Sequence, residues 1–102
     1  MTRRVVIAPE AEKDLNEAAD WYDAQKPGLG RRFARDVRAL MRKAAENPSR
    51  FRLVSRLTRR ARLPKWHYYS LYFTLSDSPP QIVIVAVFHA RRNPEDLRER
   101  LK

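Results

Sequence analysis

The amino-acid sequence predicts an α+β fold in which an antiparallel helical hairpin packs on one face of a mainly antiparallel sheet of about four strands. Two stretches in the first half carry apolar residues at helical spacing, and three stretches in the second half have the composition of strands. Short turns join these elements in the order β-α-α-β-β-β-α, so the last three strands should form a meander. A chain of 102 residues supports one hydrophobic core, which predicts a single domain over residues 1–102.

The first strand is expected at residues 3–8, where RRVVIA is β-branched at its centre and stops at Pro9. Pro9 suits the first turn of a helix, and Glu10 and Glu12 lie near the positive end of its dipole. This helix, residues 9–25, carries one apolar stripe at helical spacing: Ala11, Leu15, Ala18, Ala19 and Tyr22.

KPGLG, residues 26–30, contains both glycines of the chain and is the expected turn between the helices. The second helix is expected at residues 29–46 and ends before Pro48. Its apolar face comprises Leu29, Phe33, Val37, Leu40, Met41 and Ala44. A second stripe comprises Arg31, Arg35, Arg38 and Arg42, which is typical either of a solvated helix face or of a surface that lies along a phosphate backbone.

Three strands and a short helix are expected in the second half. RRARL at residues 59–63 alternates basic with apolar residues, as a half-exposed strand does, and YYSLYFTL at 68–75 also alternates between two faces. QIVIVAVF at 81–88 is apolar on both faces and is the expected central strand. Residues 94–102 carry two leucines four positions apart, which indicates a short amphipathic helix. Because the two long helices cover one face of the sheet, the other face is expected to be available for a partner.

The charge is strongly unbalanced, with 22 Lys and Arg against 12 Asp and Glu and a formal net charge of +10. No acidic residue occurs between residues 47 and 76, so the positive charge is concentrated in the middle of the chain. This pattern predicts a polyanionic partner, either nucleic acid or a strongly acidic protein. An arginine-rich, well-solvated surface is the alternative.

Several classes of function are excluded or disfavoured by composition. The chain has no cysteine, which excludes disulfides, thiolate nucleophiles and sulfur-ligated metals. The two histidines have no carboxylate partner at ligand spacing, so we expect neither a metal site nor another cofactor. No apolar run approaches the roughly 20 residues that span a bilayer, and no signal peptide is recognisable. A cytoplasmic protein without a membrane partner is expected.

The end of the last predicted strand, VAVFHARRNP at residues 85–94, changes abruptly from apolar to cationic. Strand ends hold side chains rigidly at the surface, which suits a preorganised site. A histidine moves a proton near neutral pH, and guanidinium groups bind phosphate and stabilise its transition-state charge, so cleavage of RNA by its own 2′-hydroxyl needs little else. The candidate catalytic residues are His89, Arg91 and Arg62. The candidate phosphate or nucleic-acid ligands are Arg59, Arg60, Arg92 and Tyr72. The alternative is that the strand simply leaves the core at this point, with its arginines solvated or only positioning a nucleic-acid backbone.

The sequence resembles the RelE/ParE toxins of bacterial type II toxin–antitoxin systems. The resemblance runs from about residue 5 to 100 and rests on the order of four segments: DLNEAADWYDAQKPGLGRRF (14–33), NPSRF (47–51), RRARL (59–63) and VAVFHARRNP (85–94). It implies the same α+β fold and a cognate acidic antitoxin as partner. RelE-like members cut mRNA on the ribosome, whereas ParE-like members poison DNA gyrase by binding it.

The resemblance also assigns residues. Arg59, Arg60 and Arg62 match the basic residues of the first strand after the helices, Arg91 or Arg92 matches the arginine after the last long strand, and His89 matches a histidine frequent in this region. RelE-like members often carry a tyrosine in the C-terminal segment, where this chain has Leu97. The expected function is therefore growth inhibition by metal-free, ribosome-dependent mRNA cleavage. Gyrase poisoning without nuclease activity is the alternative, and an inactive toxin-fold remnant or a plain nucleic-acid-binding module is a weaker third.

Overall fold

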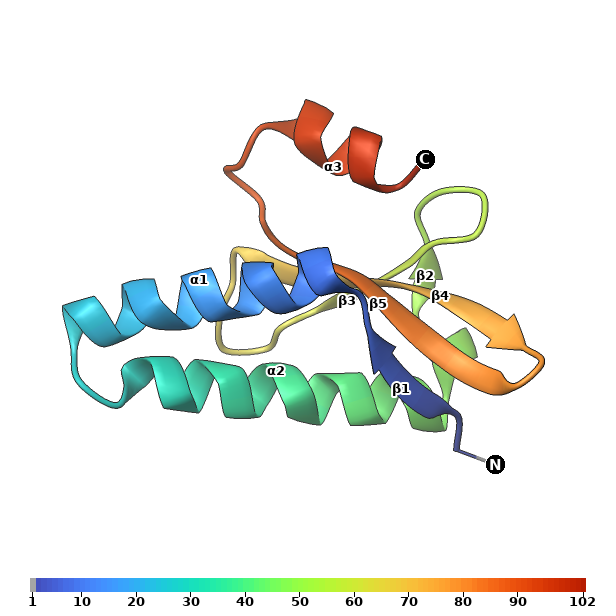
Figure 1. Ribbon diagram of the computed structural model, residues 1–102, viewed down its shortest axis with the longest axis horizontal. Helices are drawn as coiled ribbons and strands as arrows, with labels where there is room; N and C mark the ends of the chain where they lie inside the picture. The colour runs from blue at the N-terminus through green and yellow to red at the C-terminus, as the bar shows by residue number, and fades with distance from the viewer. Residues whose placement is uncertain (1) are drawn as a thin grey trace.

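The computed structural model describes residues 2–102 and confirms the α+β fold, with two long helices packed on one face of a mixed sheet (Figure 1). The elements in chain order are β1 (Arg4–Ile7), α1 (Pro9–Gln25), α2 (Leu29–Glu46), a 3₁₀ turn (Pro48–Arg50), β2 (Arg52–Leu53), β3 (Arg59–Arg62), β4 (Tyr69–Asp77), β5 (Pro80–His89) and α3 (Pro94–Arg100). In this part of the chain, none of the helices combines the length and the hydrophobicity that a bilayer crossing requires.

The sheet has five strands in the order β1-β5-β4-β3-β2. β1 runs parallel to β5, and the other neighbours are antiparallel. The apolar β5 lies inside the sheet, between β1 and β4, as expected of a strand that is apolar on both faces. The strand that the prediction missed is β2, whose Arg52 and Leu53 pair with Arg60 and Arg59. Both β2 residues are exposed, so this two-residue strand depends on edge hydrogen bonds and carries no hydrophobic pattern in the sequence.

The core lies between the helical hairpin and the sheet. Its largest fully buried side chains are Phe33, Phe73, Leu15, Met41, Leu71, Ile82, Ile84, Val37 and Val87. The two helices pack closely at Gly30, where a Cβ atom would overlap the carbonyl oxygen of Ala19. The Asp23 carboxylate accepts a hydrogen bond from the Gly30 N–H at 2.7 Å, which also ties the start of α2 to α1.

A β-bulge in β5 decides which face each of its last residues occupies. Tyr72 pairs with Ala86 and Phe73 pairs with Ile84, so Val85 has no partner on β4. The extra residue shifts the alternation by one position, and Val87 therefore faces the helices as Ile84 does. The opposite face, termed the open face, carries Arg60, Arg62, Ser70, Tyr72, Ala86 and Phe88.

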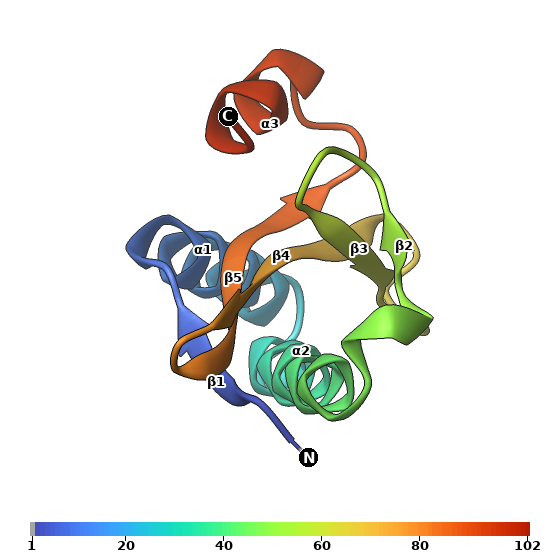
Figure 2. The same cartoon turned by 90° about the vertical axis from the view of Figure 1, so that its right-hand side faces the viewer.

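The open face, which was expected to be available for a partner, is partly covered by α3 (Figure 2). The guanidinium groups of Arg92 and Arg100 lie 4.1 Å and 5.6 Å from the centre of the Phe88 ring. Phe88 is only 4% exposed as a result of this packing. The C-terminal segment is thus part of the functional surface.

Candidate functional site

The predicted site residues divide between the two faces of the sheet. Arg60 and Tyr72 pair across β3 and β4 on the open face, and Arg62 follows them on the same face opposite Ser70. His89 pairs with Tyr69, which packs against the core on the helix side. The structure therefore brings Arg60, Arg62 and Tyr72 together and places the candidate catalytic histidine on the other face.

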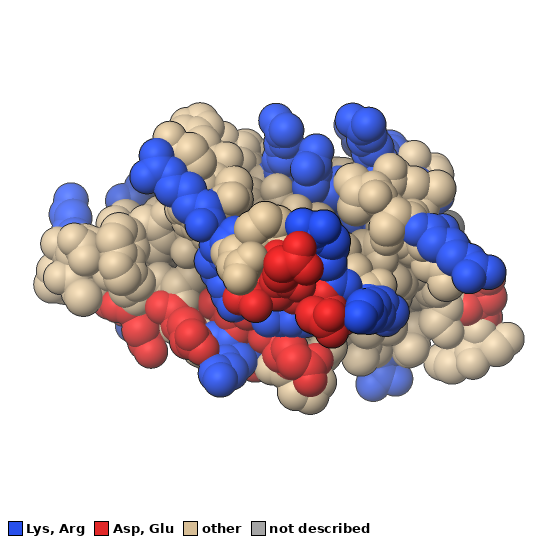
Figure 3. Space-filling model, turned by 90° about the horizontal axis from the view of Figure 1, so that it is seen from above, with Lys and Arg blue, Asp and Glu red and all other residues tan. Residues whose placement is uncertain are grey.

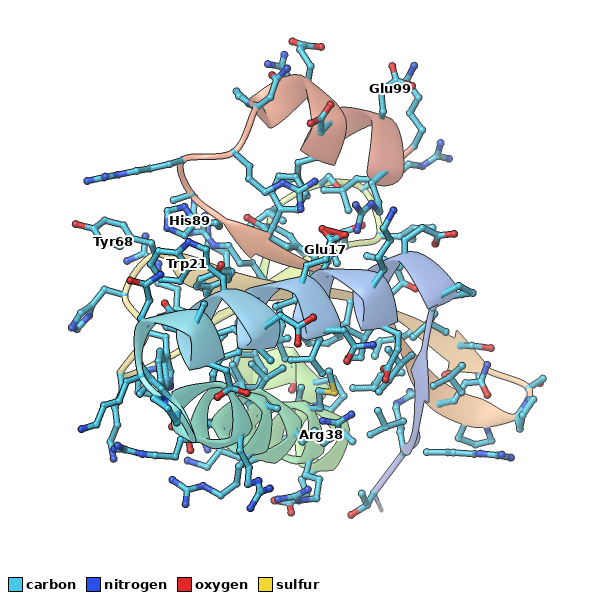
Figure 4. All side chains as sticks on the ribbon, turned by 60° about the vertical axis from the view of Figure 1, so that its left-hand side comes forward. Glu17, Trp21, Arg38, Tyr68, His89 and Glu99 are labelled. Atoms are coloured by element: carbon cyan, nitrogen blue, oxygen red, sulfur yellow. The ribbon has the colours of Figure 1, made fainter. Side chains whose placement is uncertain are left out.

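His89 faces α1 at the edge of a shallow hollow of about 220 Å³ that is also lined by Glu17 and Trp21 (Figure 4). Its ring stacks on Tyr68 with 5.4 Å between centroids and meets the Tyr69 ring edge-on at 4.9 Å. Its Nδ1 accepts a hydrogen bond of 2.9 Å from the backbone N–H of Arg91. In the neutral ring the proton then sits on Nε2, so His89 offers a donor and no free lone pair for a general base.

Two of the other predicted cations have structural partners. Arg59 donates a 2.7 Å hydrogen bond to the carbonyl oxygen of Phe51, which connects β3 to the preceding loop. Arg92 lies 3.3 Å from the carboxylate of Asp14. Within residues 2–102, Arg60, Arg62 and Arg91 have no carboxylate within ion-pair distance, although the Arg91 guanidinium lies 4.9 Å from the Tyr68 ring.

A groove of about 400 Å³ lies over the open face between α3 and the loop that joins β2 to β3. This groove, termed the α3 groove, is lined by Val54, Ser55, Arg60, Tyr72, Leu97, Arg98, Leu101 and Lys102. Most of these residues are apolar or cationic, and none of them carries a carboxylate side chain. The adjoining loop also leaves 72% of the surface of Leu57 exposed, an unusual position for a leucine of a small domain. Figure 3 looks down on this side and shows Lys and Arg around a central group of carboxylates, with further carboxylates towards the edges.

Asp14 is the residue at this site that the sequence interpretation missed. Its side chain is 6% exposed, and it accepts hydrogen bonds from the Val87 N–H at 3.0 Å and from the guanidinium of Arg100. It thereby satisfies an N–H of β5 that lies beyond the end of β1 and fixes the C-terminal end of α3. The available signal was its position in the apolar stripe of α1, between Ala11 and Ala18, where an acidic residue must be buried with a partner.

Titratable side chains nearby offer little base chemistry. Burial raises the pKa of Tyr69, and burial also raises the pKa of Tyr22, so both phenols hold their protons at neutral pH. On α2, the Asp36 carboxylate accepts a hydrogen bond of 3.0 Å from the indole N–H of Trp66, and this hydrogen bond lowers the pKa of Asp36. Among the described residues, no three His, Asp or Glu side chains form a cluster suited to a metal ion.

The model of the ParE toxin of type II toxin–antitoxin systems, parDE, matches residues 5–94. The chain belongs to the ParE toxin family. It is therefore the toxin of a type II toxin–antitoxin system, and an antitoxin is its implied partner. The resemblance to RelE/ParE toxins is thus confirmed for the ParE part, while a RelE-type assignment remains a prediction.

Solved structures support the same fold for this ParE-family chain. A chain described as the chromosomal ParDE TA system from P. aeruginosa superposes with a TM-score of 0.75 at 15% sequence identity. The match covers 88% of this chain and 98% of that one. No curated protein sequence matches the chain significantly.

Proposed function

We propose that this ParE-family toxin inhibits growth by binding DNA gyrase and that the α3 groove is its contact surface. The observation that carries the proposal is the position of Leu97, which lines the groove together with Arg60 and Tyr72. The resemblance to RelE-like nucleases would place a tyrosine near this point. A leucine side chain cannot transfer a proton, so the groove provides phosphate-binding cations and apolar contact without a base at that position.

The chemistry of the groove suits a protein partner. Leu97, Leu101 and Val54 provide an apolar centre, and the rim carries Arg60, Arg98 and Lys102. Arg98 lies 2.8 Å from Glu95 and Lys102 lies 3.0 Å from Glu99, so Arg60 is the rim cation without a carboxylate partner among the described residues. Protein interfaces combine a centre poor in charge with a polar rim in this way. Arg60 favours a partner that offers a carboxylate at this point of the rim, and the net charge of +10 favours an acidic antitoxin. Gyrase poisoning would place the toxin in the cytoplasm.

The test is to assay the purified toxin in parallel on gyrase and on translated mRNA. We expect the toxin to inhibit supercoiling by purified gyrase, while mRNA in a reconstituted translation system keeps its full length. Addition of the antitoxin should restore supercoiling. Intact supercoiling together with codon-phased mRNA cuts would overturn the proposal.

Ribosome-dependent mRNA cleavage is the second candidate, because one specific observation favours it. In the described part of the chain, Arg60 and Arg62 have no carboxylate partner and share the open face with Tyr72, whose hydroxyl can donate and accept hydrogen bonds. If the toxin cuts mRNA, Tyr72→Phe should abolish the cuts and leave the fold intact. The predicted role of His89 in such cleavage would be tested in the same assay by His89→Ala.

A further inference from the structure

The α2 helix presents a second cationic surface, remote from the α3 groove. This surface, termed the arginine stripe, consists of Arg31, Arg35, Arg38 and Arg42, all of which are exposed. At about 100° per residue the four lie within an arc of about 60°, and they span about 16 Å along the helix. Arg38 is labelled on α2 in Figure 4, and its guanidinium reaches towards Glu12 of α1. The stripe is therefore straight, continuous and mounted on a rigid element.

Little negative charge opposes the arginine stripe. Arg38 lies 3.6 Å from Glu12 of α1, and Arg35 lies 3.4 Å from Asp36. Within residues 2–102, Arg31 and Arg42 have no carboxylate within ion-pair distance. The helix as a whole carries six cations, Arg31, Arg32, Arg35, Arg38, Arg42 and Lys43, against two carboxylates, Asp36 and Glu46.

The arginine stripe also lacks what other kinds of partner require. The large hydrophobic side chains that are exposed in the described chain are Trp21, Leu53, Val54, Leu57, Tyr68 and Leu75, and none of these lies on α2. A stable protein interface needs an apolar centre, and single-stranded nucleic acid is held largely by stacking on aromatic side chains. A row of guanidinium groups at a spacing of one helical turn suits a row of phosphates instead.

We propose that the arginine stripe of α2 binds the phosphate backbone of duplex DNA without reading its sequence. α2, which carries the stripe, and α3, which lines the groove, lie on opposite sides of the sheet (Figure 2), so the toxin is able to contact DNA and a protein at the same time. The inference rests on α2 alone and does not depend on the proposed gyrase activity. A toxin that acts on gyrase would nevertheless meet its target on DNA.

The test is a salt titration of binding to a labelled duplex of about 20 base pairs, followed by fluorescence anisotropy. The variant replaces the four stripe residues: Arg31→Gln, Arg35→Gln, Arg38→Gln and Arg42→Gln. We expect its affinity to fall at least about tenfold at about 50 mM salt, and the slope of log K against log salt to decrease by about 3 to 4. The control loses the same charge at exposed arginines outside α2 and outside the α3 groove, by Arg4→Gln, Arg50→Gln, Arg52→Gln and Arg56→Gln, and should keep its affinity within about threefold.

Two further variants keep the test decisive. A stripe rebuilt with four lysines should recover most of the affinity, because nonspecific phosphate contact needs charge rather than a fork geometry. If the quadruple variant does not fold, Arg31→Gln with Arg42→Gln removes only cations without ion pairs and should lower the slope by about 2. Equal loss of affinity in the stripe variant and its control would overturn the proposal, because net charge alone would then explain binding. The proposal would also be overturned if the stripe variant lost affinity for single-stranded RNA or for the antitoxin but kept its affinity for duplex DNA.

Discussion

Arg100, near the end of the chain, donates hydrogen bonds to the buried carboxylate of Asp14 in α1, with one N–O distance of 3.3 Å. The two residues are separated by 86 positions in sequence. Their contact fixes α3 over the open face, and α3 provides Leu97 and the following Leu101 to the groove. A side chain on the helix side of the sheet thus determines the shape of the surface on the other side.

We expect Asp14→Ala to lower the free energy of unfolding by about 3 kcal/mol, because it leaves the Arg100 guanidinium and the Val87 N–H without their acceptor. Urea denaturation measures this change. The control is Glu17→Ala, an exposed position on the same helix, which should stay within about 0.5 kcal/mol of the wild type. If Asp14→Ala lowers the free energy of unfolding by no more than the control does, the carboxylate does not hold the C-terminal segment.

Gly30 should tolerate no side chain. A Cβ atom there would overlap the Ala19 carbonyl and come within 2.7 Å of Asp23 Cγ, so Gly30→Ala must push α1 and α2 apart. We expect a loss of about 3 kcal/mol in thermal or urea unfolding. The matched control is Gly28→Asn, where φ is +89° but nothing surrounds the Cβ, and the loss there should be about 1 kcal/mol. Equal losses at the two glycines would contradict the close helix contact.

The Trp66–Asp36 hydrogen bond predicts a pH dependence of stability. The indole N–H favours the ionised carboxylate, so the pKa of Asp36 in the folded protein lies below its ordinary value of 3.8. The stabilisation is therefore fully present above that value and is lost as the pH falls through the lowered pKa. We expect wild type to be more stable than Asp36→Asn at neutral pH, with the difference narrowing below about pH 4. Urea unfolding at several pH values measures this, and a difference that does not change with pH would refute it.

Much of the fold could be predicted because its elements carry strong periodic signals. The stripes that contain Leu15 and Phe33 predicted both long helices, and the apolar run of β5 predicted a central strand. β2 could not be predicted because two exposed residues have no pattern.

The candidate site was harder to predict because its arrangement depends on tertiary detail. β5 is apolar on both faces, so nothing in the sequence shows that the bulge at Val85 moves His89 to the helix side. Leu97 was recognised as a departure from the RelE pattern, but its place in one groove with Arg60 depends on how α3 folds back. That position is set by Asp14, whose place in the apolar stripe of α1 indicates burial, whereas its partner Arg100 is 86 positions away and only the assembled structure shows it.

The most direct measurement compares Leu97→Asn with His89→Ala in inhibition of gyrase supercoiling, after melting curves have shown that both variants fold. If the toxin binds its target through the α3 groove, Leu97→Asn should raise the concentration for half-inhibition at least about tenfold, a loss of about 1.4 kcal/mol of binding free energy. His89→Ala should leave it within about threefold, because the ring lies on the other face of the sheet. The proposed mechanism would be contradicted if the wild-type toxin left gyrase active. It would also be contradicted if His89→Ala abolished the inhibition of supercoiling while Leu97→Asn still inhibited it.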